Sequence, residues 1–236
     1  MDHLLPGATS ADVRAQNPTV AVLPIGSFEQ HGEFHPLITD TAIACAIAQR
    51  IAIDYGLFLL PPVTFSCSHE HAGFPGSVSI RATTLALVIS DIQESLKASG
   101  IRHLVLVNGH GGNYVLQNVV QEANTTERRM TLFPLPLDWN HARTKAKMET
   151  NAHEDMHAGE LETSILLHIS PDSLRPGYQT ADWRADDRKF LLVKGMTDYT
   201  TSGVIGFPSL GTPEKGKIAL ESLSESFKSH LQALTE

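Results

Sequence analysis

The amino-acid sequence predicts an α/β fold, a three-layer sandwich in which a mainly parallel sheet carries helices on both faces. Short apolar runs typical of buried strands alternate along the chain with segments of helical apolar spacing. No internal repeat, low-complexity tract or long linker interrupts this alternation. Because 236 residues with 42% apolar side chains suffice for one core and are few for two, we expect residues 1–236 to form a single domain.

Four apolar runs are the predicted strands: residues 19–26, 57–60, 101–107 and 130–137. The first and the third are followed by loops that contain glycine and histidine. In parallel sheets, ligands gather at the loops that leave the carboxyl ends of the strands. We therefore expect a functional site where these two loops meet.

Five segments with helical apolar spacing are the predicted helices: residues 40–55, 84–99, about 114–127, 158–169 and 213–234. Thr39 or Asp40 is the expected N-cap of the first of these helices, and Gly56 is its expected stop. The last helix is expected to follow a Thr212 cap with Pro213 in its first position, where a missing N–H costs little.

The charge balance and the apolar pattern exclude several classes of protein. A net charge of -8 and a pI near 5.8 leave no basic stripe, so nucleic acid is not an expected partner. Residues 1–5 lack the basic flank and long apolar segment of a signal peptide, and no apolar run reaches membrane-spanning length. We therefore expect a cytoplasmic protein without a membrane partner.

The histidine and cysteine content indicates that histidines, rather than cysteines, are the candidate metal ligands. Twelve histidines are many for this length, and several stand beside glycine and carboxylates, as they do in metal-binding loops. Cys45 and Cys67 show no metal-type spacing and form no disulfide framework. We expect both cysteines to be ordinary reduced thiols.

The first candidate cluster lies between the first predicted strand and the following helix. Glu29 and His31 can project toward one point, while Gly32 lets the chain turn closely around it, and Asp40 stands at the helix start. A metal ion fits this pattern. The alternative is that Asp40 is only a helix cap and His31 only a polar loop residue.

The second cluster is the loop Asn-Gly-His-Gly-Gly-Asn at residues 108–113, after a predicted strand. Its glycines permit a close approach of the backbone to a ligand, and His110 can point into the same cleft. A phosphate-binding loop is one alternative, but the lysine and hydroxyl residue of a P-loop are missing. A tight turn with an incidental histidine is the other.

The third cluster opens the helix predicted at residues 158–169. His157 and Glu162 are five residues apart, too far around a regular helix to share one face, so we expect His157 to precede the first turn. Glu160 is open to two interpretations, a first-turn glutamate that favours the helix dipole or a metal ligand.

All three motifs, in this order, resemble those of the creatininase family of metal-dependent amidohydrolases. The family pattern is a Gly-Ser-x-Glu-Gln-His-Gly loop with Thr-Asp, then Asn-Gly-His-Gly-Gly-Asn, then His-Ala-Gly-x-x-Glu-Thr-Ser. Residues 68–77 also look like the substrate-side loop of the family, and residues 203–206 and 212–216 like its C-terminal segment. The resemblance therefore runs from about residue 20 to residue 217.

The resemblance implies a site with two divalent metal ions, zinc, manganese or iron. Glu29 and His110 would bind one ion, His31 and Glu162 the other, and Asp40 would bridge both. His157 falls where the family places a catalytic acid/base. Two cations in such a site lower the pKa of a shared water and polarise a substrate carbonyl. We expect seven residues to bind substrate, some of which depart from the family pattern: Phe34, His35, Ser68, Glu70, His71, Gly111 and Gly112.

The implied activity is hydrolysis of a carbon-nitrogen amide bond, cyclic or linear, in a small molecule by a homo-oligomer, often a hexamer. Creatinine itself is a poor candidate, because Gly111 and Gly112 replace an aromatic and an acidic residue of true creatinine hydrolases. Three alternatives stay open: a peptidase that trims a ribosomally made peptide precursor (mycofactocin-type), a non-catalytic metal-dependent binding protein, and a mononuclear iron oxygenase.

Overall fold

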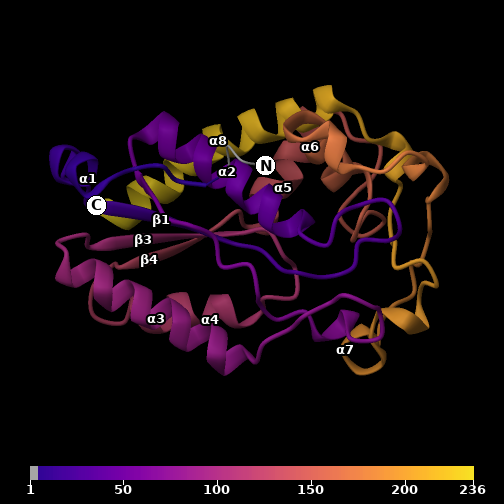
Figure 1. The fold of residues 1–236 in the computed structure, drawn as a ribbon, viewed down its shortest axis with the longest axis horizontal. Helices are drawn as coiled ribbons and strands as arrows, with labels where there is room; N and C mark the ends of the chain where they lie inside the picture. Colours follow the sequence, from indigo (N-terminus) through magenta and orange to yellow (C-terminus); the bar gives the residue numbers. More distant parts are fainter. Residues whose placement is uncertain (1–4) are drawn as a thin grey trace.

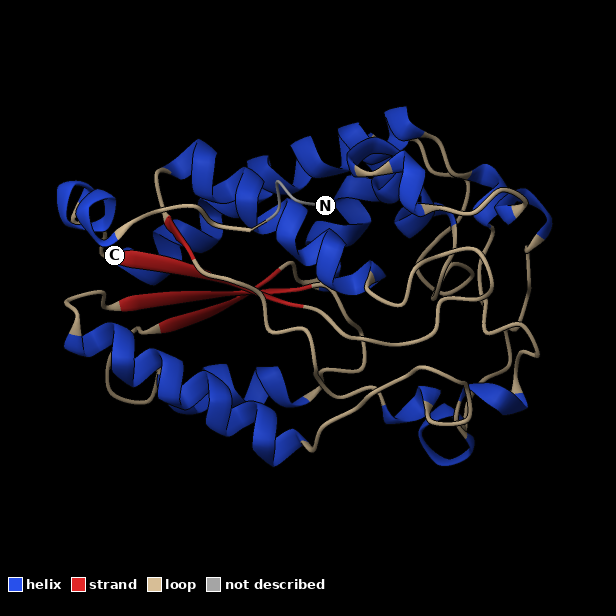
Figure 2. Cartoon of the chain, in the orientation of Figure 1, coloured by secondary structure: helices blue, strands red, loops and turns tan. Residues whose placement is uncertain are grey.

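Four parallel strands form the centre of the molecule in the order β2-β1-β3-β4. The computed structural model describes residues 5–236; the expectation about a signal peptide falls mostly on residues 1–4, which lie outside them. The strands are β1 (Val20–Ile25), β2 (Phe58–Leu59), β3 (His103–Asn108) and β4 (Met130–Phe133). Figure 2 shows them between two layers of helices, which confirms the predicted three-layer α/β fold.

Alternation along β1 explains why the sheet needs helices on both faces. Val20 and Val22 belong to one apolar cluster, whereas Ala21, Leu23 and Ile25 belong to the other. Successive strand residues point to opposite faces, so a strand that is apolar throughout must be covered twice. A core therefore lies on each side of the sheet.

Helices cover both faces of the sheet (Figure 1). The first layer consists of α2 (Thr39–Tyr55), α5 (Pro136–Lys145), α6 (Glu160–Ile169) and α8 (Pro213–Thr235). The second consists of α3 (Ala82–Ala98) and α4 (Val115–Ala123). The remaining short helices are α1 (Ser10–Gln16), α7 (Leu191–Lys194) and the 3-10 turns His69–His71, Pro171–Ser173, Tyr178–Thr180, Met196–Asp198 and Pro208–Leu210.

Helix ends follow the predicted signals in α8 and at the end of α2. The Thr212 side chain accepts a hydrogen bond from the Lys215 N–H, and Pro213 is the first helical residue. Gly56 ends α2 with a left-handed φ of 65°. The N-cap predicted for α2 was wrong, because the cap is Ile38 and Asp40 lies inside the helix. Asp40 is therefore free for a role other than capping.

Two element ends differ from the prediction by four residues each, and helix α1 was not predicted. The strand expected at residues 130–137 ends at Phe133, because prolines 134 and 136 cannot donate to a ladder and the second one opens α5. The helix expected to reach residue 127 ends at Ala123, where the Asn124 side chain accepts the N–H groups of Arg129 and Met130. Helix α1 buries no side chain and so left no apolar signal. No helix of the described residues is long and apolar enough to cross a membrane.

Candidate metal centre

Three segments meet at the carboxyl end of the sheet. The loop after β1 supplies Glu29 and His31, the loop after β3 supplies His110, and α6 supplies Glu162. The start of α2 packs directly on the ends of β1 and β3, because a Cβ at Gly26 or Gly109 would overlap its backbone. This close approach brings Asp40 to the centre of the other four side chains.

The five predicted ligand residues form two groups that share Asp40. One group is Glu29, Asp40 and His110, and the other is His31, Asp40 and Glu162; in each, candidate ligand atoms lie within 4.8 Å of one another. The His110 Nδ1 is 3.2 Å from Glu29 Oε1 and 3.0 Å from Asp40 Oδ2. The His31 Nε2 is 3.0 Å from Asp40 Oδ1 and 4.0 Å from Glu162 Oε2.

Main-chain carbonyl groups determine which nitrogen each histidine presents to the cluster. The His31 Nδ1 donates to the Glu29 carbonyl oxygen at 3.0 Å, which leaves Nε2 toward Asp40. The His110 Nε2 donates to the Cys67 carbonyl oxygen at 3.0 Å, which leaves Nδ1 toward Glu29 and Asp40. A carbonyl oxygen only accepts, so each contact fixes the ring orientation that a metal ligand needs.

Buried carboxylate oxygens without donors indicate that the cluster fits cations. Both oxygens of Glu29 and the Oδ2 of Asp40 are buried and receive no hydrogen bond within the described chain. An unpaired buried carboxylate is costly, and a divalent cation removes that cost. Carboxylates and imidazoles together suit zinc, manganese or iron, so the residues fit a binuclear metal site.

The electrostatics of the cluster also favour positive charge. Burial by itself would lower the pKa of His31, but the negative charges of Asp40, Glu162 and Glu29 outweigh it and raise that pKa to about 9. Burial would likewise lower the pKa of His110, but the negative charges of Glu29 and Asp40 outweigh burial and raise this pKa. The carboxylates thus favour the protonated, cationic forms of His31 and His110, which shows that the cluster stabilises positive charge.

His157 lies beside the cluster, just ahead of α6 as predicted. Its Nε2 donates to the Gln30 carbonyl oxygen at 2.7 Å, so Nδ1 carries the lone pair, 3.8 Å from Glu29 Oε1. It also shares a third group of candidate ligand atoms with Glu29 and His31. Burial and then the positive charge of His31 lower the pKa of His157 from the ordinary 6.5 to about 4. The contribution of His31 disappears when that histidine is deprotonated.

The side chains of Glu160 and Glu162, both in the first turn of α6, lie in different surroundings. Glu162 Oε2 accepts the Ala158 N–H at 2.5 Å, and burial raises the pKa of Glu162 to about 7. Glu160 instead binds the Lys215 Nζ at 2.6 Å and the Thr150 hydroxyl at 2.7 Å. The described structure thus places Glu160 outside the cluster, in a structural contact.

Three residues that the sequence did not single out support the site, namely Gln30, Asp155 and Arg143. The Gln30 amide nitrogen donates to the Gly203 carbonyl oxygen at 3.1 Å and lies 2.9 Å from His71 Nδ1. Asp155 receives the N–H groups of Glu160 at 2.5 Å and Leu161 at 3.1 Å, and it pairs with Arg143 at 3.0 Å. Gln30 stands inside the first motif and Asp155 stands two residues before the third, and these positions were the available signal.

A cavity of about 120 Å³ lies over the cluster and gives access to it. Of the predicted substrate-binding residues, Glu70, His71, Gly111 and Gly112 line it. His71 Nε2 is also 3.2 Å from Glu29 Oε1, which places it against a candidate ligand.

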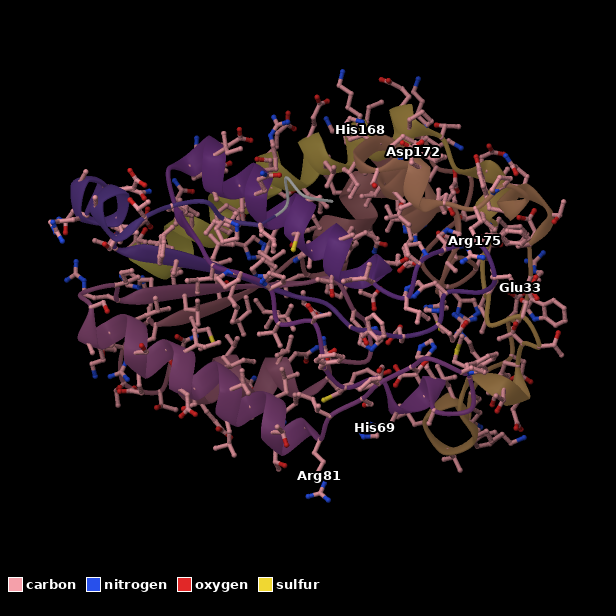
Figure 3. All side chains as sticks on the ribbon, in the orientation of Figure 1. Glu33, His69, Arg81, His168, Asp172 and Arg175 are labelled. Carbon is pink, nitrogen blue, oxygen red and sulfur yellow. The ribbon has the colours of Figure 1, made fainter. Side chains whose placement is uncertain are left out.

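The other three predicted substrate-binding residues do not line this cavity. His35 Nε2 is 2.8 Å from the Thr163 hydroxyl, and the buried Ser68 hydroxyl has no hydrogen-bond partner within residues 5–236. Phe34 lies against Gly177, and its carbonyl accepts the Arg175 N–H at 2.9 Å. Figure 3 shows Arg175 and Glu33 near each other at this end of the molecule.

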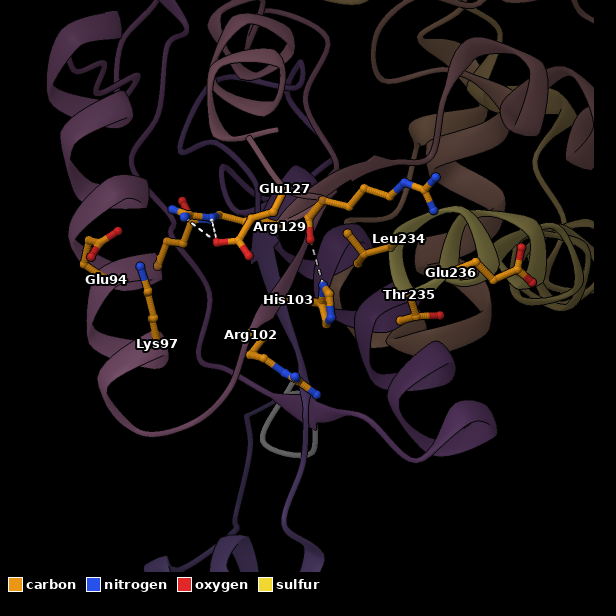
Figure 4. Close-up of a pocket in the computed structure, with 11 residues that line it drawn as sticks. Glu94, Lys97, Arg102, His103, Glu127, Arg129, Leu234, Thr235 and Glu236 are labelled. Atoms are coloured by element: carbon orange, nitrogen blue, oxygen red, sulfur yellow. Dashed lines mark hydrogen bonds and ion pairs between the residues drawn. The ribbon is translucent and has the colours of Figure 1, made fainter. Parts of the chain in front are cut away.

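A second hollow, of about 400 Å³, lies at the opposite end of the sheet (Figure 4). Its charged residues have both signs: Arg129 pairs with Glu127, and the His103 Nδ1 donates to the Arg128 carbonyl oxygen at 3.1 Å. None of the predicted site residues lines it. The chemistry-bearing side chains are therefore concentrated at the carboxyl end.

Comparisons with known proteins agree with this geometry. The family model Creatininase (creatinine amidohydrolase) matches residues 7–231. A mycofactocin precursor peptide peptidase of Mycobacterium tuberculosis (strain CDC 1551 / Oshkosh) is 33% identical over 231 residues, with 90% of this chain and 84% of that protein covered. A creatinine amidohydrolase of Pseudomonas putida is 27% identical over 177 residues, 67% of each chain. A mutant creatininase of Zn-Zn type superposes with a TM-score of 0.82 at 21% identity, over 98% of this chain and 97% of that one.

Proposed function

The chain belongs to the creatininase family, and we propose that it is a metal-dependent hydrolase that cleaves an amide bond in a short peptide precursor. The observation that supports the peptide substrate is the 33% identity to a mycofactocin precursor peptide peptidase along 90% of the chain. The Gly-Gly form of the loop at residues 108–113 favours the same choice over creatinine, because it lacks the aromatic and acidic side chains that true creatinine hydrolases carry there.

In this proposal, five side chains hold two divalent ions. Glu29 and His110 hold one, His31 and Glu162 the other, and Asp40 holds both, in agreement with the two groups that share this aspartate. Zinc, manganese or iron bound there would polarise the scissile carbonyl and lower the pKa of a water molecule. The orphaned oxygens of Glu29 and Asp40 support the assignment.

His157 is the proposed proton carrier of the reaction. Its Nδ1 is unprotonated and borders the cavity, while its Nε2 is held by the Gln30 carbonyl group. The imidazole can take a proton from the attacking water at Nδ1 and return it to the leaving nitrogen. The Gln30 contact keeps the ring in the orientation that this transfer needs.

A small cyclic or linear amide is the second candidate substrate. The cavity directly over the cluster, about 120 Å³, suits a small group, and the Pseudomonas putida relative is a creatinine amidohydrolase. We expect creatinine itself to be hydrolysed poorly or not at all, since Gly111 and Gly112 replace the bulky and acidic residues of true creatinine hydrolases. A robust turnover of creatinine would show that this inference is wrong.

The decisive experiment screens the zinc- or manganese-loaded protein against short peptides, cyclic amides, formamides and ureides, with product mass as the readout. We expect cleavage of peptides above all other classes. Elemental analysis should find two divalent ions per chain. Full activity with one ion or fewer per chain would rule out the dinuclear site, and cleavage of small amides alone would rule out the peptide substrate.

A further inference from the structure

A hollow of about 440 Å³ opens beside the cavity that covers the candidate metal centre. The two spaces share four lining residues, namely Glu70, Gly112, Tyr114 and Leu191. The hollow therefore continues the path into the metal centre. None of the residues proposed to bind metal lines it, so it has no role in the chemistry derived above.

The outer wall of the hollow is apolar and exposed. Leu192 and Val193 of α7 are 79% and 84% exposed, and Tyr114, which leads into α4, is 59% exposed. Single exposed apolar residues are common, but a group of them along one hollow marks a binding surface. These apolar residues continue directly into the metal-site cavity. A substrate that reaches the metal centre would therefore contact them.

Glu70 stands where the hollow meets the cavity. Its Oε1 occupies space that a Cβ at position 112 would need, and it lies 3.6 Å from His110 Nε2. His110 is its one ion-pair contact among the described residues, and Lys194, which lines the same hollow, pairs with Asp198 instead. His69, labelled in Figure 3, is exposed at the rim of the same hollow. The carboxylate is thus an acceptor placed at the inner end of an apolar wall.

We propose that this hollow binds apolar residues of the substrate peptide next to the scissile bond, with Glu70 accepting a main-chain N–H of that segment. The proposal rests on the proposed function and specifies its substrate as a peptide with apolar side chains. An apolar wall with one acceptor at its inner end matches a peptide segment, which offers apolar side chains and N–H donors together.

Two fluorescein-labelled probes test the hollow on the zinc-loaded protein, an apolar pentapeptide (Ala-Leu-Val-Leu-Ala) and pentaglycine. Binding is followed by fluorescence anisotropy, and mass spectrometry records whether each probe is cleaved. We expect the apolar probe to bind at least roughly tenfold more tightly than pentaglycine, as the burial of one or two apolar side chains provides. The Leu192→Asp/Val193→Asp variant should lose this preference, whereas Glu70→Gln should weaken both probes alike.

Leu87→Asp is the matched control, because Leu87 is an apolar residue of α3 that is 63% exposed and lies outside the hollow. It should keep the preference. Equal binding of the two probes by the parent, or an equal loss in Leu87→Asp, overturns the proposal. A change of molecular mass in the double variant, measured by light scattering, assigns the surface to contact between copies and overturns it too. A parent that prefers the apolar probe but cleaves no peptide contradicts the proposed function alone.

Discussion

Glu29 and Glu160 are both completely buried, yet their carboxylates have opposite surroundings. Glu160 accepts hydrogen bonds from the Lys215 ammonium, the Thr150 hydroxyl and two main-chain N–H groups. Among the described residues, none donates a hydrogen bond to Glu29 or to Asp40 Oδ2. Burial alone therefore does not distinguish a structural carboxylate from a functional one.

The difference shows that the chain itself satisfies the carboxylate of Glu160 but not that of Glu29. At Glu160, burial by itself would raise the pKa, but the bonds from Lys215, Thr150 and the backbone of Glu149 outweigh it and lower the pKa. The chain has satisfied this charge with its own donors. At Glu29 and Asp40, only histidines among the described residues face the negative charge. These histidines can convert to the neutral form, and carboxylates with neutral imidazoles are a metal-ligand set.

The comparison is tested most severely by Asp40→Ala. Asp40 belongs to both groups of candidate ligands, so its loss should deprive both ions at once. We expect turnover to fall by at least roughly 10⁴-fold, because the activation of water depends on the bound cations. Elemental analysis should find fewer than one ion per chain. Two ions retained in this variant would contradict the shared role of Asp40.

His157→Ala should separate proton transfer from metal binding. Turnover should fall by roughly 10²–10⁴-fold, the usual contribution of a general acid/base. Metal content and thermal stability should stay near those of the parent, whereas His110→Ala should lose metal together with activity. If His157→Ala were depleted of metal like His110→Ala, or kept its turnover within a few-fold, His157 would be a ligand or a positioning residue instead.

Gly112→Ala and Gly111→Ala form a matched pair in one loop. A Cβ at Gly112 would overlap Glu70 Oε1 and His110 Nε2 and would lie 2.8 Å from the Cys67 carbonyl oxygen, whereas a Cβ at Gly111 meets nothing within 4 Å. Displacement of His110 should weaken metal binding by roughly 10–100-fold in Gly112→Ala. Titration with a chelator measures the affinity. Equal affinities in the two variants would contradict the role given to this close contact.

Glu160→Gln should affect stability and leave the metal centre intact. Loss of the ion pair with Lys215 should lower the free energy of unfolding by about 2–3 kcal/mol near neutral pH. Metal stoichiometry and turnover should not change. A loss of metal from this variant would show that Glu160 and Glu29 are less different than their surroundings indicate.

The same variant should change how stability depends on pH. Because folding lowers the pKa of Glu160, its contribution is complete above the unfolded-state value near 4.5 and declines as the pH falls through the lower, folded-state value. The parent should therefore lose more stability than Glu160→Gln between roughly pH 5 and pH 3. Denaturant unfolding across this range measures the difference, and parallel curves would contradict it.

The fold was predictable because its signals are local. The apolar runs of β1 and β3 and the Thr212 cap of α8 each depend on neighbouring residues, and the structure confirms them. The predictions were wrong where the local signal was misleading or missing. Asp40 is a typical cap residue, but α2 begins at Thr39 with Ile38 as its N-cap. Helix α1 has no buried face to reveal it.

The site was predictable in its members and less so in its surroundings. The structure brings Glu29, His31, Asp40, His110 and Glu162 together, and their role as ligands stays a prediction. Sequence spacing did not indicate that His35 would bond to Thr163 away from the cavity, because that contact joins residues 128 positions apart. For the same reason, the hollow beside α7 was not apparent before the chain was seen in three dimensions.

The packing of α8 on α6 has a consequence for the timing of synthesis. Lys215 of α8 holds Glu160, and Gly216 lies against the Ser164 carbonyl group, where a Cβ would overlap it. Helix α6, which carries Glu162, is therefore held in place by a helix made about fifty residues later. We expect the nascent chain to remain inactive on the ribosome until residues 213–235 have emerged and docked, so that no substrate is consumed by an unfinished enzyme.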